Sequence, residues 1–209
     1  MPRRAIFRPV PFHRPATPAH PFRHVLKTLP VLAVFWLLTL GLIPALIVRA
    51  QRATELAALF LFPQQTVVGI VALAAGTPLV LWAGLQLVGA GGGTPLAYDP
   101  PRRLVISGPY AWLRNPMVVG FIVQGAGVGF LSGSILVALF FVVIALWWNA
   151  LVRPLDEDKL QKTFGREYEL YRRSVPCWVP LRRRWSPPPL TGPISLDELP
   201  EQRHSRRRR

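Results

Sequence analysis

Apolar residues of this chain are gathered in long, nearly uninterrupted blocks instead of alternating with polar residues. The first block runs from about residue 29 to 48 and the second from about 66 to 88, and each is close to the ~20 residues that a helix needs to cross a bilayer. A shorter block from about 117 to 131 is followed, after Ser132-Gly133-Ser134, by another from 135 to 152. The pattern predicts an all-α, polytopic integral membrane protein with four transmembrane helices, the last two forming a helical hairpin.

Charge is distributed as unevenly as hydrophobicity. The chain has 25 Lys and Arg against 10 Asp and Glu, a formal net charge of +15, and the basic residues crowd its ends. Basic flanks around apolar blocks follow the positive-inside rule, and no nucleic-acid recognition fold accompanies them, so a cell-membrane protein is favoured over nucleic-acid binding. An even number of crossings places both termini in the cytoplasm. Arg49 and Arg52 would then lie on the opposite side, which keeps a five-helix arrangement open.

Composition divides the chain into four parts. Residues 1–27 are basic and proline-rich, and we expect a disordered cytoplasmic tail there; residues 186–209 form a second such tail. We expect transmembrane helices 1 and 2 within residues 28–91. Residues 92–185 contain a polar loop, the helical hairpin and a further helix, and every candidate for chemistry lies in this part.

The hydrophobic period changes after Asp156. Leu160, Phe164, Tyr168 and Tyr171 recur at intervals of four, four and three residues, which predicts an amphipathic helix on the cytoplasmic surface of the bundle. Two oppositely charged pairs have the favourable i, i+4 order: Asp158 with Lys162, and Glu169 with Arg173.

Cysteine and histidine usage limits the possible chemistry. Cys177 is the only cysteine, so an intramolecular disulfide is excluded, and we expect its thiol to be inert. The four histidines all lie outside the apolar blocks: His13, His20, His24 and His204. A histidine-bound metal or a histidine general base in the core is therefore disfavoured, and no metal site is predicted.

Two polar motifs frame the hairpin. Gly108-Pro-Tyr-Ala-Trp-Leu-Arg-Asn-Pro-Met117 precedes it, and Asp156-Glu-Asp-Lys-Leu160 follows it, continuing into Phe164-Gly-Arg-Glu-Tyr168 and Val175-Pro176. Because both ends of a hairpin face the same side of the membrane, these segments can meet at one surface. Such a place suits a polar cofactor that serves a membrane-borne substrate.

In order and spacing, these motifs and the hairpin between them closely resemble the isoprenylcysteine carboxyl methyltransferase family, which is related to the phospholipid methyltransferases. The resemblance covers about residues 92 to 180, so that residues 92–185 would form the methyltransferase core. It implies an integral membrane enzyme that uses S-adenosyl-L-methionine to methylate a carboxylate of a lipid-attached or small hydrophobic acceptor. The cofactor would lie between the Arg-Asn-Pro segment and the acidic pair, at the cytoplasmic surface.

The resemblance also implies a set of site residues. Those expected to line the cofactor pocket are Leu104, Val105, Tyr110, Asn115, Pro116, Met117, Val118, Asp156 and Glu157. Arg114 and Arg153 are the candidate catalytic residues: Arg114 would help to hold the cofactor, and Arg153 would orient the acceptor. S-adenosylmethionine carries a sulfonium, an ammonium and a carboxylate, so acids together with arginine and amide donors form a suitable set.

The sequence departs from the family pattern at three positions. Many relatives have Arg-His-Pro-x-Tyr where this chain has Asn115 and Val118, and Asp156 replaces a glutamate. Other functions therefore stay open: methylation of a phospholipid amine or a thiol, or a catalytically degenerate membrane scaffold. The acids could also be first-turn helix residues, and the arginines could be interfacial. A nicotinamide-dependent membrane reductase is disfavoured because no phosphate-binding glycine motif opens a helix.

Overall fold

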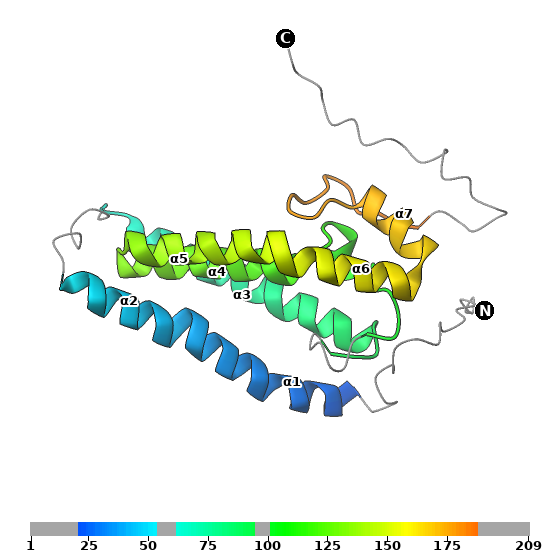
Figure 1. Ribbon diagram of the computed structural model, residues 1–209, viewed down its shortest axis with the longest axis horizontal. Coiled ribbons are helices and arrows are strands. Elements are labelled where there is room, and N and C mark those ends of the chain that lie inside the picture. The colour runs from blue at the N-terminus through cyan, green and yellow to red at the C-terminus, as the bar shows by residue number, and fades with distance from the viewer. Residues whose placement is uncertain (1–20, 54–61, 95–100, 188–209) are drawn as a thin grey trace, which may run out of the picture.

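The computed structural model describes residues 21–53, 62–94 and 101–187, and every regular element within these ranges is helical (Figure 1). The elements in chain order are α1 (Pro21–Trp36), η1 (Leu37–Leu42), α2 (Ile43–Arg52), α3 (Gln65–Gly89), η3 (Gly108–Ala111), α4 (Pro116–Ser132), α5 (Ile135–Trp147), η4 (Trp148–Val152), α6 (Arg153–Phe164) and α7 (Arg166–Ser174). The segments η1 and η4 are π-helical, and η3 is a short 3-10 helix. The prediction of an all-α fold is confirmed for these ranges.

Three helical stretches are long and apolar enough to cross a membrane: Thr28–Arg52, Gln65–Gly89 and Ile135–Phe164. Many of their large apolar side chains are exposed, including Leu37 at 68% and Val143 at 61%, which is unfavourable in water and suits contact with lipid. These features indicate an integral membrane protein. Helix α4 is apolar but has 17 residues, fewer than the ~20 of a full span, so four crossings remain a prediction.

Helices α3 and α4 pack closely against each other. A Cβ atom built on Gly76 would lie 2.6 Å from the carbonyl oxygen of Gly120, and one built on Gly120 would lie 2.9 Å from that of Gly76. Small residues let two backbones approach in this way within an apolar bundle. In the same interface, the Gln124 side-chain amide donates a 2.9 Å hydrogen bond to the Thr77 hydroxyl. The start of α4 is thereby fixed beside the second half of α3.

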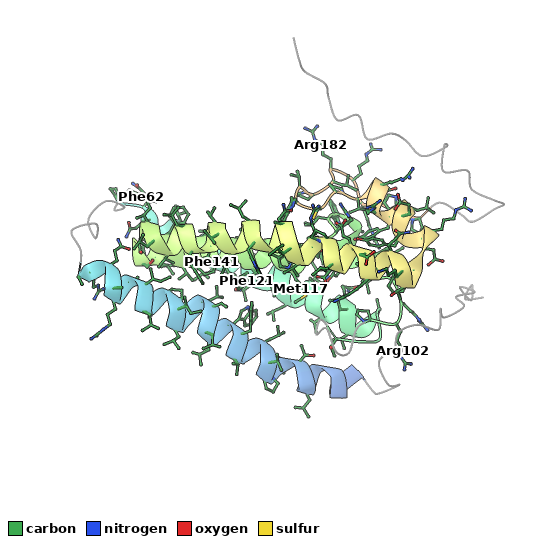
Figure 2. All side chains as sticks on the ribbon, in the orientation of Figure 1. Phe62, Arg102, Met117, Phe121, Phe141 and Arg182 are labelled. Atoms are coloured by element: carbon green, nitrogen blue, oxygen red, sulfur yellow. The ribbon has the colours of Figure 1, made fainter. Side chains whose placement is uncertain are left out.

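The turn predicted between the last two apolar blocks is present. Gly133 ends α4 with a φ of 58°, a left-handed conformation that glycine adopts readily, and the Ser134 hydroxyl accepts a hydrogen bond from the Val137 amide to cap α5. Helices α4 and α5 run side by side, and the rings of Phe121 on α4 and Phe141 on α5, both labelled in Figure 2, are in contact with centroids 5.9 Å apart. The start of α4 and the end of α5 therefore lie at the same end of the bundle (Figure 1).

The prediction of one separate amphipathic helix is wrong. Helix α5 continues through η4 into α6 without interruption, and the chain breaks instead at Gly165, whose φ of 53° separates α6 from α7. The four apolar residues that predicted this helix nevertheless pack together, because Leu160 and Phe164 lie against the buried residues Tyr168 and Tyr171. Both predicted i, i+4 ion pairs are also present: Lys162 Nζ lies 2.6 Å from Asp158, and Arg173 Nε lies 2.7 Å from Glu169.

The first helix begins earlier than predicted. Helix α1 starts at Pro21, inside the segment 1–27 that we expected to be disordered. Proline is well suited to the first helical position, because the amide that it lacks has no intrahelical acceptor there. The remaining parts of the predicted tails, residues 1–20 and 188–209, lie outside the described residues.

Candidate functional site

The segment that follows α7 lies across the Gly-Pro-Tyr segment. Three backbone hydrogen bonds of 2.9 Å join them: Arg114 N to Pro176 O, Leu181 N to Trp112 O, and Trp185 N to Ala111 O. The two sequence motifs, separated by the whole α4–α5 pair, therefore form one structural unit. We call this unit the clasp. It lies at the end of the bundle where α3 and α5 finish and α4 begins (Figure 1).

Two arginines surround one carboxylate beside the clasp. Arg114 Nη1 lies 2.8 Å from Glu157 Oε1, and Arg153 Nη1 lies 3.7 Å from the same oxygen. The Arg114 and Glu157 side chains are only 12% and 18% exposed, so solvent screens this pair less than a surface pair. Together the three side chains carry one excess positive charge. The group can therefore accept a further anion such as a carboxylate.

The Arg114 guanidinium has one hydrogen-bond donor without an acceptor. Its Nε is buried and makes no hydrogen bond, whereas buried polar atoms usually have a partner. Tyr168 lies beside the same ion pair. The pKa of Tyr168 is raised to about 12, mainly by burial and also by the charge of Glu157, while Arg114 opposes the increase. The phenol is therefore neutral at physiological pH.

Asn115 and Cys177 connect the two halves of the clasp. The Asn115 side-chain amide donates a 3.0 Å hydrogen bond to the Cys177 sulfur, which is itself buried. Asn115 occupies the cap position of α4 without capping it through its side chain, and Pro116 follows as the first helical residue. The Asn115 amide is thus oriented toward the C-terminal segment, where sequence reasoning had assigned Cys177 no role.

Several predicted pocket residues form apolar clusters under the clasp. Val105 and Tyr110 are buried against Ala83, and Met117 packs on the same cluster. Leu104 packs instead on the cluster of Tyr168, Tyr171 and Val175. The Tyr171 hydroxyl donates a 2.8 Å hydrogen bond to the Tyr110 carbonyl, which ties the two clusters together. Burial holds the pKa of both phenols well above its usual value, so they are neutral packing groups.

The two adjacent acids have different environments. Glu157 faces Arg114, whereas Asp156 is exposed and lies outside the ion-pair group. Neighbouring residues on a helix point about 100° apart, so both carboxylates cannot face the same guanidinium. Of the predicted site residues, the structure brings Arg114, Arg153 and Glu157 into direct contact; Val118 is half-buried on the first turn of α4.

Two further polar contacts near the site were missed from the sequence. The Ser107 hydroxyl donates a 2.8 Å hydrogen bond to Gln86 on α3, and Trp178 Nε1 donates a 3.1 Å hydrogen bond to the Asn149 side chain. Asn149 also lies next to Arg153, whose Nε reaches its carbonyl at 3.5 Å. A polar residue inside an apolar block is a recognisable signal of function, and Asn149 offered that signal.

Comparison with known proteins finds relatives among methyltransferases. Residues 64–167 match the family model described as phospholipid methyltransferase. A protein-S-isoprenylcysteine O-methyltransferase of Schizosaccharomyces pombe is 35% identical over 78 residues, which is 37% of this chain and 33% of that protein. Protein-S-isoprenylcysteine O-methyltransferase B of Arabidopsis thaliana is 32% identical over 79 residues, covering 38% and 40% of the two chains.

A relative with a different name matches over a longer stretch. The nickel-cobalt-cadmium resistance protein NccN of Alcaligenes xylosoxydans xylosoxydans is 30% identical over 114 residues, which is 54% of this chain and 48% of that protein. Each match spans less than half the length of these relatives. No solved structure matches the chain. The resemblance drawn from the two motifs is confirmed: residues 64 to 167 match the phospholipid methyltransferase family model, and the chain is similar to isoprenylcysteine O-methyltransferases.

Proposed function

We propose that this chain is an integral membrane methyltransferase that uses S-adenosylmethionine to methylate a carboxylate on a lipid-attached or small hydrophobic acceptor. One observation carries the proposal. The Arg114–Glu157–Arg153 group and the clasp stand together at one end of a bundle of apolar helices, in a chain whose residues 64–167 match the phospholipid methyltransferase family model. A charged cofactor and a membrane-borne acceptor can meet at such a place.

The residues of the site fit the charges of the cofactor. The unpaired Nε of Arg114 and the excess positive charge of the group suit its carboxylate, while Glu157 and the exposed Asp156 suit its cationic groups. Asn115 adds an amide beside them. Val105, Tyr110 and Met117 offer an apolar surface under the clasp for the uncharged part of the molecule.

A carboxylate acceptor agrees best with the groups in the site. When bound, S-adenosylmethionine supplies a methyl group on a positively charged sulfur, and an ionised carboxylate attacks it without prior deprotonation. Arg153 is 30% exposed and only loosely held by Glu157, so it can turn to orient that carboxylate. An amine would first have to lose a proton, and Tyr168, with its pKa raised to about 12, is a poor base at neutral pH.

Water exclusion is the other contribution that we assign to this chain. The C-terminal segment covers the Gly-Pro-Tyr segment through three backbone hydrogen bonds, and its Trp185 packs on the buried side chains of Tyr168 and Tyr171. Methyl transfer is accelerated mainly by positioning and by removal of solvent, and a closed clasp supplies both.

We place the site on the cytoplasmic side together with both termini. Figure 2 shows Arg102 and Arg182 at the end of the molecule that carries the site, and Phe62 at the opposite end. Arg103, Arg183 and Arg184 add to the positive charge of the site end, as the positive-inside rule expects of a cytoplasmic surface.

The experiment is incubation of membranes containing the full chain with methyl-labelled S-adenosylmethionine. Transfer to a carboxylate produces an ester, so the label is released as a volatile product by mild base. Label that survives base in lipid amines would replace this proposal with the phospholipid alternative, and the absence of both cofactor binding and transfer would favour a scaffold. The same membranes containing the Glu157→Gln variant show whether any methyl transfer depends on this site.

A further inference from the structure

A cavity lies at the end of the bundle away from Arg114 and Glu157. It is a groove of about 780 Å³ between the continuous η1–α2 stretch and helices α3 and α4. Its floor is apolar and comprises Leu40, Pro44, Val48, Leu73, Val128 and Leu131. Gly41 also lines it, and a Cβ atom there would approach only Leu37, at 3.9 Å, so the groove is open along this wall.

The rim of this groove is cationic. Arg49 and Arg52 are exposed and lie three residues apart in the last turns of α2, and the Ser132 hydroxyl adds a polar atom opposite them. Within the part of the chain that the structure describes, every carboxylate is on α6 or α7, at the far end of the molecule. Two exposed guanidiniums three residues apart make this rim positively charged, and an anion is the complementary ligand.

The dimensions of the groove match one leaflet of a bilayer. From Leu40 to Arg49 the helix rises about 14 Å, and half of a hydrocarbon core of ~30 Å is about 15 Å. The apolar floor therefore has the depth of the acyl-chain region, and the arginines stand at the level of the head groups. A single lipid oriented as in the bilayer would place its chain and its phosphate on matching surfaces.

A buried hydrogen bond fixes the cationic end of the groove. The Ser134 hydroxyl bonds the Gln51 side chain, and these residues are only 2% and 4% exposed. Gln51 lies between the two arginines in the sequence of α2, and Ser134 caps the start of α5. The end of α2 is thereby held against the α4–α5 turn, so the groove exists before any ligand enters it.

From the charge, the depth and the fixed rim, we propose that this groove binds one anionic glycerophospholipid, with an acyl chain on the apolar floor and the phosphate between Arg49 and Arg52. The site is separate from the methyltransferase site and does not depend on that assignment. Its ligand is a structural lipid held by the protein, and methyl transfer is expected to be unchanged when the groove is empty.

The test is native mass spectrometry of the purified, delipidated full chain titrated with dioleoyl phosphatidylglycerol or dioleoyl phosphatidylcholine. The anionic lipid should bind at least about ten-fold more tightly, which is the effect of about 1.4 kcal/mol. Arg49→Gln combined with Arg52→Gln should reduce its affinity to that of the zwitterionic lipid. Ala45→Phe fills the groove and keeps both arginines, and it should weaken binding as well.

Matched variants distinguish binding in this groove from general electrostatic attraction between an anionic lipid and a basic protein. Arg182→Gln combined with Arg183→Gln removes two arginines at the other end, and Val143→Phe adds an aromatic ring on an exposed face of α5; neither should change the affinity. The proposal is overturned if the wild-type protein binds both lipids with equal affinity. It is also overturned if substituting Arg182 and Arg183 weakens binding as strongly as substituting Arg49 and Arg52, or if the Ala45→Phe variant binds the anionic lipid as tightly as the wild type. Displacement of the lipid by equimolar glycerol phosphate would likewise overturn it, because the apolar floor would then contribute nothing.

Discussion

Arg114 Nη1 lies 2.8 Å from Glu157 Oε1, although 43 residues separate the two positions in the chain. The first residue stands just before α4 and the second lies on α6, so the side-by-side packing of α4 and α5 brings them together. Arg153 reaches the same carboxylate from one turn earlier on α6. The contact therefore reports both the fold and the proposed site, and the first predictions concern it.

Glu157→Gln should remove the negative charge between the two arginines while keeping the side-chain shape. A hydrogen bond between charged groups contributes roughly 1.5–3 kcal/mol, so binding of S-adenosylmethionine should weaken roughly ten- to hundred-fold. Isothermal titration calorimetry in detergent measures this directly. The matched control is Glu169→Gln, because Glu169 also has two arginine partners, Arg172 and Arg173, but lies outside the group. Equal losses in both variants would contradict the site assignment.

Arg153→Gln should act on the acceptor more than on the cofactor. The contact of Arg153 with Glu157 is longer than that of Arg114, and its side chain is more exposed, so we expect it to be available to a substrate carboxylate. The KM for the acceptor should rise by about ten-fold or more, the effect of losing a charged hydrogen bond, while cofactor affinity stays near that of the wild type. Steady-state kinetics with each substrate varied in turn distinguishes the two effects. A rise confined to the cofactor KM would reverse the roles of the arginines.

Packing between α3 and α4 allows a matched pair of glycine variants. At Gly76 a Cβ atom would lie 2.6 Å from the backbone oxygen of Gly120, which cannot move aside easily, so Gly76→Ala should destabilise the protein by roughly 1–3 kcal/mol. At Gly84, on the same helix, a Cβ atom would meet only Met117, at 4.0 Å, and Gly84→Ala should be neutral or stabilising. Thermal unfolding in detergent compares them, and equal melting temperatures would argue against the close approach of the two helices.

The apolar blocks were sufficient to predict most of the helices, because long runs of apolar residues leave little choice of secondary structure in a membrane. The uninterrupted α5–η4–α6 rod was not predicted, since the change of hydrophobic period after Asp156 was interpreted as the start of a new element. Gly165 was the true break, and its φ of 53° becomes apparent only when α7 folds back onto Leu104 and Ile106. A lone glycine between two helical patterns does not by itself indicate such a reversal.

The charged part of the site was predictable in composition but not in pairing. Arg114, Arg153 and Glu157 were all expected from the motifs, yet only the orientation of α6 decides that Glu157 faces Arg114 and that Asp156 does not. The contacts of Asn115 with Cys177 and of Trp178 with Asn149 depend on where the segment after α7 crosses the clasp. Spacing along the sequence carries no information about that crossing.

Acid should loosen α7 through Glu169. The hydrogen bond from Arg173 is the main reason that the pKa of Glu169 lies below its usual value; burial opposes this effect, and Arg172 adds to it. Since the folded-state pKa is lower than the unfolded one, the stabilisation is fully present above the ordinary glutamate pKa of about 4.3 and is lost as pH falls through the folded value. The melting temperature of Glu169→Gln should therefore be below that of the wild type at pH 7, and the difference should shrink below about pH 4. Asp158→Asn, which breaks an exposed pair with Lys162, should change the melting temperature little at any pH. A difference between wild type and Glu169→Gln that stays constant down to pH 3 would show that the ion pairs of Glu169 do not stabilise the fold.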